Sequence, residues 1–346
     1  MEHQSLNKIA TADFIKTNRK NKWTLLVLSV ALLFVFALAL MCGRYKIPIS
    51  DIINVLTGQD ANLSSYNVLI YLRIPRTLAA ILVGASLALS GAVYQSTFNN
   101  PLVSPDVLGV SSGAAVGASI AILLNFSYFG ITVLSLITGV ISVCIALILP
   151  KLIRNTSMLS LVLSGIIVNA IMNSLIGLVK YLVDGTDKLS SITFWMMGGF
   201  SNIKYTDVLY LLPIVVMCCT ILLLLRWRIN VLSLGKEGSI TSGVNYRLVR
   251  MVIIVCTTLL TAVSVSVSGS ISWIGLAMPH IARLLCGNDN RFTLPCTMLC
   301  GSIFMVVVDI LSRCISVNEI PLSIMTGILG AVIYISVLIK KGKDIR

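Results

Sequence analysis

Long apolar segments separated by short polar connections make up most of this chain. Ten of them are candidate helical spans: 23–42, 76–97, 107–124, 131–150, 157–181, 205–225, 251–268, 271–286, 294–312 and 321–339. A helix needs about 20 apolar residues to cross the roughly 30 Å hydrocarbon core of a bilayer, and most of these segments approach that length. The pattern therefore predicts an all-α polytopic membrane protein with about ten transmembrane helices.

The charges at the two ends of the chain bear on the number of spans. Segment 271–286 is short and carries Pro279, His280 and Arg283, so its length alone does not decide whether it crosses. Basic residues precede the first segment and follow the last: Lys16, Arg19, Lys20 and Lys22, then Lys340, Lys341, Lys343 and Arg346. The positive-inside rule places both ends in the cytoplasm, which requires an even number of crossings. We therefore count ten.

The first apolar run, from Trp23 to Met41, is predicted to be a retained span. The apolar core of a secretory signal is usually about 7–15 residues long, and Leu40 and Met41 are bulky for cleavage before Cys42. We expect residues 1–22 to form a cytoplasmic N-terminal tail. Residues 23–346 then form a single transmembrane domain.

Composition supports this class of protein. Hydrophobic residues make up 57% of the chain, charged residues make up 11%, and the mean hydropathy is +0.96. These values exclude an ordinary soluble domain. The net charge of +13 comes from basic residues that flank the spans, without the aromatic-interleaved patch of a nucleic-acid-binding surface. We therefore expect a lipid bilayer and no nucleic acid as a partner.

Small residues are dense in two neighbouring segments. Gly, Ala and Ser surround the helix predicted between Ala79 and Ala92, and Gly109, Gly113 and Gly117 form two GxxxG steps. Such residues let helix backbones approach closely in a bilayer. The sequence therefore predicts that the helix at 76–97 is surrounded by protein.

The nine cysteines and two histidines do not form a metal-binding pattern. The cysteines lie mostly within apolar runs and include no CxxC pair, which predicts buried apolar side chains without disulfides. His280 has no second histidine nearby in the sequence, so we expect it to make a structural hydrogen bond. No metal site is predicted.

Polar side chains within the spans have two interpretations. Asn169, Asn173 and Lys180 share one helix face. A second stripe contains Thr257, Thr261, Ser264 and Ser268. Each stripe either lines a water-filled path or hydrogen-bonds within the helices, and the second interpretation is favoured for Thr and Ser. Asp309 and Arg313, one turn apart, predict a local ion pair.

Two connections are longer than simple turns require. The outer one, 43–75, contains PISDIINVLTG, which predicts a short amphipathic helix. The inner one, 226–250, combines Gly235, Gly238 and Gly243 with basic ends. The chain has no GxxxxGK[ST] loop for nucleotide phosphates and no plausible catalytic cluster. We therefore expect a transport subunit that is not itself an enzyme and binds no cofactor, with any ATP-driven work supplied by a partner.

Four motifs in order along the chain resemble one family. They are LRIPRTLAA through NNPLVSPDVLGVSSGAAVGA (72–118), VLSLGKEGSITSGV (231–244), SGSISWIGLAMPHIARLLCGNDNRFTLP (268–295) and VDILSR through EIPLSIMTGILGA (308–331). Together they resemble the permease subunits of bacterial ABC importers for iron-siderophores, haem and vitamin B12, the type II importers. The resemblance covers nearly all of the chain after about residue 40.

The resemblance implies roles for particular residues. Arg73, Arg76 and Arg313 match arginines that accept acidic side chains of a substrate-binding protein, although anchoring of the spans at the interface is an alternative. Leu232, Leu234, Gly235, Lys236 and Glu237 match the element that couples the permease to its ATPase; Lys236 stands where the family commonly has glutamate. A translocation gate is implied at Asn100, Leu102, Thr156 and Ser157, and Asn169 and Asn173 are candidates for the path.

The resemblance also implies an assembly. Two permeases, identical or paralogous, surround a path, with two ATP-binding subunits below and an extracytoplasmic binding protein above. ATP and Mg would bind the ATPases, and the complex would lie in the bacterial cytoplasmic membrane. The expected cargo is a ferric siderophore, with haem or cobalamin as alternatives. A secondary transporter driven by an ion gradient is the rival class, disfavoured by the scarcity of intramembrane carboxylates.

Overall fold

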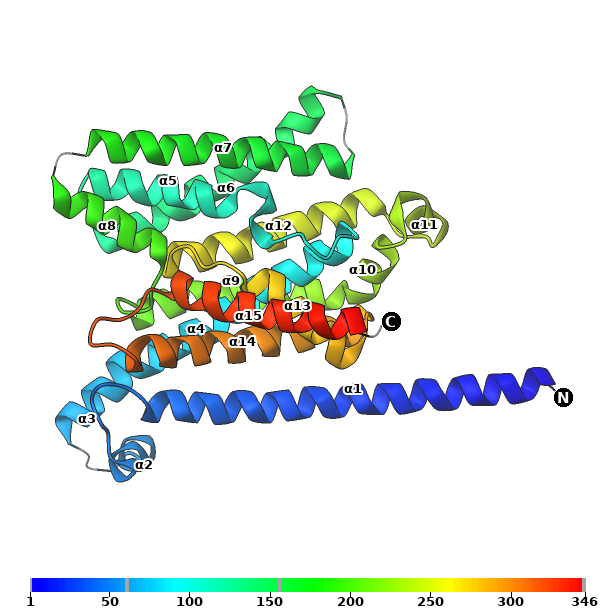
Figure 1. Ribbon diagram of the computed structural model, residues 1–346, viewed down its shortest axis with the longest axis horizontal. Coiled ribbons are helices and arrows are strands. Elements are labelled where there is room, and N and C mark those ends of the chain that lie inside the picture. The colour runs from blue at the N-terminus through cyan, green and yellow to red at the C-terminus, as the bar shows by residue number, and fades with distance from the viewer. Residues whose placement is uncertain (1, 60–61, 155–156, 184, 344–346) are drawn as a thin grey trace.

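The computed structural model describes residues 2–59, 62–154, 157–183 and 185–343, and these residues form a helical bundle (Figure 1). A π-helical turn, Val68–Arg73, leads into α4, and a 3₁₀ turn, Pro105–Leu108, leads into α5. The α-helices are α1 Glu2–Met41, α2 Ile49–Thr57, α3 Leu63–Asn67, α4 Ile74–Thr97, α5 Val110–Leu123, α6 Tyr128–Leu152, α7 Met158–Leu182, α8 Thr186–Met197, α9 Tyr205–Leu224, α10 Arg226–Leu232, α11 Gly235–Thr241, α12 Tyr246–Ser268, α13 Ile274–Cys286, α14 Asn290–Cys314 and α15 Leu322–Lys343.

All ten predicted spans correspond to helices. Seven helical segments among the described residues are long and apolar enough to cross a membrane, and they lie in α1, α3–α4, α6, α7, α9, α12 and α14. The other three spans correspond to the shorter apolar helices α5, α13 and α15. At about 1.5 Å per residue, the 13 residues of α13 extend only about 20 Å. The segment whose length was ambiguous in the sequence is thus a helix shorter than the hydrocarbon core.

The two ends of the bundle differ in what they carry. The start of α1, the end of α15, and α11 lie at one end, whereas α2, α3 and α8 lie at the other (Figure 1). We call the first the inner end and the second the outer end, after the predicted orientation. The predicted tail, as far as the structure describes it, continues α1 as helix from Glu2.

Helix α4 is the centre of the bundle. Of its most apolar stretch, 83% is buried, against 17% for α1. It packs against α14, α12, α13 and α9. A Cβ added at Gly84 would overlap the Gly301 backbone on α14, and one added at Gly91 would overlap Gly275 on α13. The expectation that small residues surround this helix with protein is confirmed.

Glycines also allow close packing between α5 and α6. Added Cβ atoms at Gly113 and Gly117 would overlap Ser142 and Thr138, respectively. The two GxxxG steps therefore mark a helix–helix contact inside one chain, and they bring α6 close enough for Ser142 Oγ to donate to the Gly109 carbonyl at 2.7 Å.

Two short helices lie at the outer end. The predicted amphipathic helix is α2, which buries Ile52 and leaves Ile49 and Ile53 exposed. Helix α8 was not predicted, because its sequence TDKLSSITFWMM lacks a long apolar run. It follows α7 and covers part of the outer end of α5.

Candidate functional site

Four charged side chains meet at the outer end of the bundle, and we call them the outer charge cluster. Arg76 on α4 donates from Nε to Asp309 Oδ1 on α14 at 2.7 Å, and from Nη1 to Glu319 Oε1 at 2.9 Å. Arg313 Nε lies 3.5 Å from Asp309 Oδ2. The Asp309 side chain is 0% exposed. The predicted Asp309–Arg313 ion pair is confirmed, but Arg76 from another helix is the nearer partner.

Arg73 and Arg313 also hold the outer end of α1. The Arg73 guanidinium donates to the carbonyls of Leu40, Met41 and Tyr45, and its bond to Met41 measures 2.9 Å. Arg313 Nη2 donates to the Ala39 carbonyl at 2.7 Å. The last carbonyls of a helix have no partner within the helix, and these two arginines supply donors for them. They also place positive charge at the negative end of the helix dipole.

The structure thus brings the three predicted docking arginines together, although each is buried. Arg73, Arg76 and Arg313 are 4%, 8% and 5% exposed. Their guanidinium groups bond to carboxylates and backbone carbonyls of the bundle, of which the sequence had predicted only the Asp309–Arg313 pair. Arg76 Nη2 has no hydrogen-bond partner among the described residues. Their role in binding a partner protein remains a prediction.

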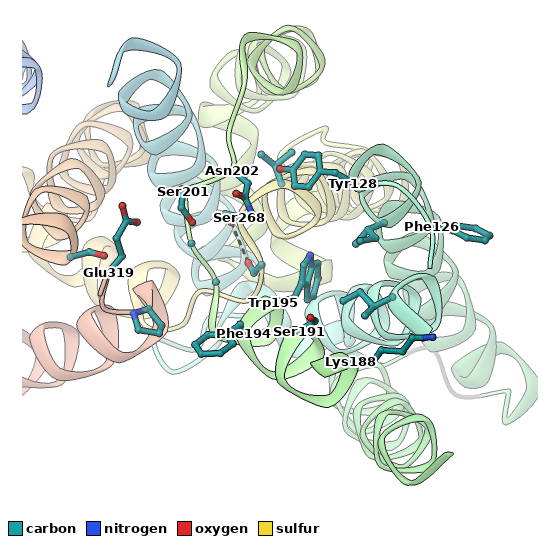
Figure 2. A pocket seen from close by; sticks show the side chains of 18 of the residues that line it. Phe126, Tyr128, Lys188, Ser191, Phe194, Trp195, Ser201, Asn202, Ser268 and Glu319 are labelled. Atoms are coloured by element: carbon teal, nitrogen blue, oxygen red, sulfur yellow. Dashed lines mark hydrogen bonds between the residues drawn. The ribbon is translucent and has the colours of Figure 1, made fainter. Parts of the chain in front are cut away.

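A cavity of about 670 Å³ opens at the outer end beside this cluster (Figure 2). Glu319 lies at one side of it and Lys188 at the other, with Phe194 and Trp195 of α8 between them (Figure 2). The lining therefore combines aromatic surface with one acidic and one basic group. Lys188 Nζ donates to the Leu123 carbonyl at 2.9 Å, which ties α8 to the end of α5.

Close backbone contacts hold the wall of this cavity. Gly199 N donates to the Ser268 carbonyl at 2.9 Å, and Leu322 N donates to the Gly198 carbonyl at 3.1 Å. Gly198 has a φ of 72° and Gly269 also has a φ of 72°, and a Cβ on Gly269 would overlap the Trp195 carbonyl. Both positions require glycine, because they combine a left-handed backbone with close contact. The connection after α8 is thereby fixed against α12 and α15.

At the inner end, the long connection forms α10 and α11. Leu234, Lys236 and Glu237 are exposed, and Leu234 is 67% exposed. Leu232, predicted to belong to the same surface, is instead buried in the bundle at 2% exposure. Gly235 begins α11 with a φ of 85°, which accounts for glycine between the two helices. The structure thus divides the predicted coupling residues into a buried anchor and an exposed surface.

A polar contact fixes α10 to the connection between α13 and α14. Asn230 Nδ2 donates to Asp289 Oδ1 at 2.8 Å, and Asn230 Oδ1 accepts from the Asn290 backbone at 3.0 Å. Burial acts to raise the pKa of Asp289, but hydrogen bonds from the Arg291 backbone, the Asn230 amide and the Arg291 guanidinium outweigh it. They hold that pKa below its usual 3.8.

The predicted gate residues also lie at the inner end. Asn100 and Leu102 are exposed, and Asn100 Oδ1 accepts from the Leu102 backbone at 3.0 Å. Ser157 caps α7 by accepting from Ser160 N at 3.1 Å, while Thr156 lies outside the described residues. His280 Nε2 hydrogen-bonds the Pro101 carbonyl at 3.1 Å, so its predicted structural bond is confirmed. It fixes the loop that carries Asn100 and Leu102.

The predicted path residues separate into packed and exposed groups. Asn169 Oδ1 accepts from Ser112 Oγ at 2.6 Å, and Asn169 Nδ2 donates to the Asp106 carbonyl at 3.3 Å, so Asn169 joins α7 to α5. Asn173 is exposed. In α12, the hydroxyls of Thr257, Thr261 and Ser268 donate to carbonyls of their own helix, as predicted, whereas the Ser264 hydroxyl has no hydrogen-bond partner among the described residues. Only Ser268 of these four also lines the outer cavity.

Sequence reasoning missed several residues that shape the outer cavity. Glu319 was seen only within a motif, and Lys188, Phe194 and Trp195 belong to the unpredicted helix α8. The sequence does contain one indication of such a site, which is a lysine and two aromatic residues within a short, weakly apolar segment between two spans. Their common location depends on how α8 folds back toward α12 and α15, which periodicity does not reveal.

Comparisons with known proteins agree with this architecture. The FecCD transport family matches residues 31–340. The chain is 37% identical to the molybdate import system permease protein MolB of Haemophilus influenzae, over 91% of this chain and 95% of that protein. It is 38% identical to an iron chelatin transport system permease protein of Helicobacter pylori, over 81% of this chain and 85% of that protein.

A solved structure shows the same fold. It is an inward-facing conformation of a metal-chelate type ABC transporter, with a TM-score of 0.84 and 36% sequence identity. The alignment covers 91% of this chain and 98% of that one. The all-helical permease architecture predicted from the sequence is therefore confirmed over almost the entire chain.

Proposed function

Because the chain belongs to the FecCD transport family, as a permease of the ABC importer class, we propose that it carries a ferric siderophore into the cytoplasm. The outer cavity is the observation that carries this choice of cargo. Its volume of about 670 Å³ lies within the roughly 300–1,000 Å³ typical of sites for drug-sized ligands. A siderophore complex is of that size, whereas a tetrahedral oxyanion is far smaller.

The lining of the cavity also suits a chelate. Phe194 and Trp195 offer apolar surface to the organic ligand, and Lys188 offers a positive charge to a complex that is often anionic. The relative described as an iron chelatin permease supports the same class of cargo.

ATP supplies the energy in this proposal, through two partner subunits that bind ATP and Mg. The exposed surface of α11, with Leu234, Lys236 and Glu237, is the element that would transmit their motion to the bundle. A second permease would complete the path. An ion-gradient mechanism is disfavoured because Asp309 is paired with Arg76 and Arg313, and therefore is not available as an ion-relay carboxylate.

Uptake into liposomes tests both cargo and energy source. The permease is reconstituted into liposomes with its ATPase and binding protein. Uptake of a ⁵⁵Fe-loaded siderophore is then measured with ATP either on the ATPase side of the membrane or on the opposite side. We expect accumulation only with ATP on the ATPase side, and reduced accumulation in Lys188→Gln. The matched control is Lys46→Gln, an exposed outer-end lysine that does not line the cavity. Accumulation driven by an ion gradient without ATP would contradict the proposal.

Molybdate is a second candidate cargo, on the strength of the relative from Haemophilus influenzae. Uptake of ⁹⁹Mo-molybdate in the same vesicles distinguishes it. Haem and cobalamin form a further arm of the assay. A preference for molybdate over every ferric chelate tested would overturn the cargo proposed here while leaving the ABC importer class unchanged.

A further inference from the structure

A second cavity, of about 530 Å³, lies at the inner end between α6, α7 and α12. Its walls are the last turns of α6 and the first turns of α12, and Leu161 of α7 closes one side. It is separate from the outer cavity and contains none of the individual gate or coupling residues predicted above, although Tyr246, Arg247 and Arg250 belong to the end of the predicted cytoplasmic coupling loop, 226–250. We call it the inner groove.

The inner groove combines an apolar interior with basic groups. Leu147, Leu161 and Ile254 are among the apolar side chains that line it. Lys151, Arg247 and Arg250 line it as well, and none of its described lining residues carries a carboxylate. An apolar groove bordered by several cations is complementary to an amphiphile with a negative headgroup.

The surface around the inner groove is also apolar. Val255 and Met251 on α12 are 49% and 62% exposed, and Leu152 and Leu159, each close in sequence to a lining residue of α6 or α7, are 72% and 68% exposed. In a soluble protein such a surface would be a liability, whereas next to acyl chains it is the expected surface of a span. The basic groups lie at the helix ends, where phospholipid headgroups are found. The groove therefore continues from headgroup depth into hydrocarbon depth.

We propose that the inner groove is a binding site for one anionic phospholipid. Its phosphate is held by Lys151, Arg247 and Arg250, and an acyl chain lies along Leu147, Ile254 and Val255. The apolar depth favours a lipid over an acidic segment of a soluble partner, because such a segment would leave its polar backbone against these side chains. The lipid would join α6 to the first turns of α12, which directly follow the α10–α11 connection.

Native mass spectrometry of the full-length protein, titrated with short-chain phosphatidylglycerol or phosphatidylcholine, tests the proposal. We expect the tightest site to prefer phosphatidylglycerol, and Lys151→Gln with Arg247→Gln to weaken it at least tenfold. The matched control removes one lysine and one arginine from exposed positions on α1 at the same end, as Lys16→Gln with Arg19→Gln. Its affinity is expected to stay within twofold of the wild type.

Two further variants separate a lipid from a simple anion and from misfolding. Val255→Trp fills the apolar part without changing charge, and we expect it to weaken phosphatidylglycerol at least threefold; inorganic phosphate should not compete. Lys151→Arg with Arg247→Lys keeps the charges and is expected to retain binding. No headgroup preference in the wild type, or equal loss in the α1 control, would overturn the proposal. The proposal would also be overturned if Lys151→Gln with Arg247→Gln left lipid binding unchanged but abolished binding of the ATPase subunit, because the groove would then be a contact site for that subunit.

Discussion

The outer charge cluster and the α10–α11 connection lie at opposite ends of the bundle and differ in how far their charged side chains are buried. At the outer end, Arg76, Asp309 and Arg313 are buried and bonded to one another or to the end of α1. At the inner end, Lys236 and Glu237 are exposed on a short helix that begins at Gly235. Family resemblance predicts partner contacts for both groups. The structure shows that the inner group presents its side chains at the surface, whereas Arg76, Asp309 and Arg313 of the outer charge cluster are buried and Glu319 is partly exposed.

The difference shows that a charged residue in a family motif can stabilise the fold itself, whether or not it also contacts a partner protein. Removing one member of a buried ion pair leaves a charge without compensation, whereas removing an exposed charge costs little. Mutations at the two ends should therefore separate into effects on stability and effects on association. The four predictions below use that separation.

The largest effect is expected for Asp309→Asn. Arg76 and Arg313 would lose their shared carboxylate in a buried site, and only Glu319 would remain for Arg76. We expect the free energy of unfolding to fall by about 3 kcal/mol, measured by equilibrium unfolding in mixed micelles. Asp187→Asn, at an exposed carboxylate on α8, should change it by less than about 0.5 kcal/mol. Equal stability of the two variants would show that the cluster does not stabilise the bundle.

Leu234→Glu should have the next largest effect, but on association. Leu234 is 67% exposed, so the change should leave folding intact. If α11 binds the ATPase, a charge at the centre of that contact should weaken it about thirtyfold, or about 2 kcal/mol. Binding of the purified ATPase subunit is the measurement. Leu63→Glu, at a residue 73% exposed at the outer end, is the control, and comparable loss in both would refute the coupling role.

Arg76→Gln distinguishes docking from a purely structural role at the outer end. We expect about tenfold weaker binding of the substrate-binding protein, or about 1.4 kcal/mol, in the fraction that is folded. Arg44→Gln removes an exposed arginine from the same end and should have little effect. Glu319→Ala should not weaken binding, because it removes the acceptor of Arg76 Nη1 and frees that group for an incoming carboxylate. Unchanged affinity in folded Arg76→Gln would make these arginines anchors of the helices alone.

The smallest effect is expected for Asn230→Ala, which breaks the contact between α10 and Asp289. Hydrogen exchange should report opening of α10 that is easier by about 1 kcal/mol. Since the pKa of folded Asp289 is held below 3.8, its stabilising contribution is present above pH 3.8 and is lost as the pH falls through the lower folded value. The wild type should therefore approach the variant in acid. A constant difference at all pH values would exclude this role for the carboxylate.

The arrangement of spans could be predicted because it depends on local properties of the sequence. Apolar length located all ten helices, and the small residues Gly84 and Gly91 indicated correctly that α4 lies at the centre. The Asp309–Arg313 pair is four residues apart on one helix, so spacing was sufficient to predict it.

Interactions between distant segments could not be predicted in the same way. Arg76 and Asp309 are far apart in the sequence, and nothing in the local pattern of either indicates their pairing. Asn169 was considered for the path because it shares a face with Lys180, but its bond to Ser112 depends on where α5 lies. Trp273, the residue immediately before α13, has a φ of 72°, a conformation that favours glycine, so residue propensities did not indicate where this helix starts.

The arginine bonds at the outer end of α1 have a consequence for biogenesis. Helix α1 precedes the other described helices along the chain, little of it is buried, and the helix it packs against most is α14, which comes much later in the sequence. One of the donors to its last carbonyls, Arg313, is translated only after nine of the ten spans. During synthesis the bonds from Arg73 to the end of α1 can therefore form early, whereas the bond from Arg313 and the packing against α14 can form only near the end. A nascent chain cut short before α14 would keep the Arg73 bonds but lose both the Arg313 bond and the helix against which α1 packs, and we expect a membrane protease to remove such a chain as incomplete.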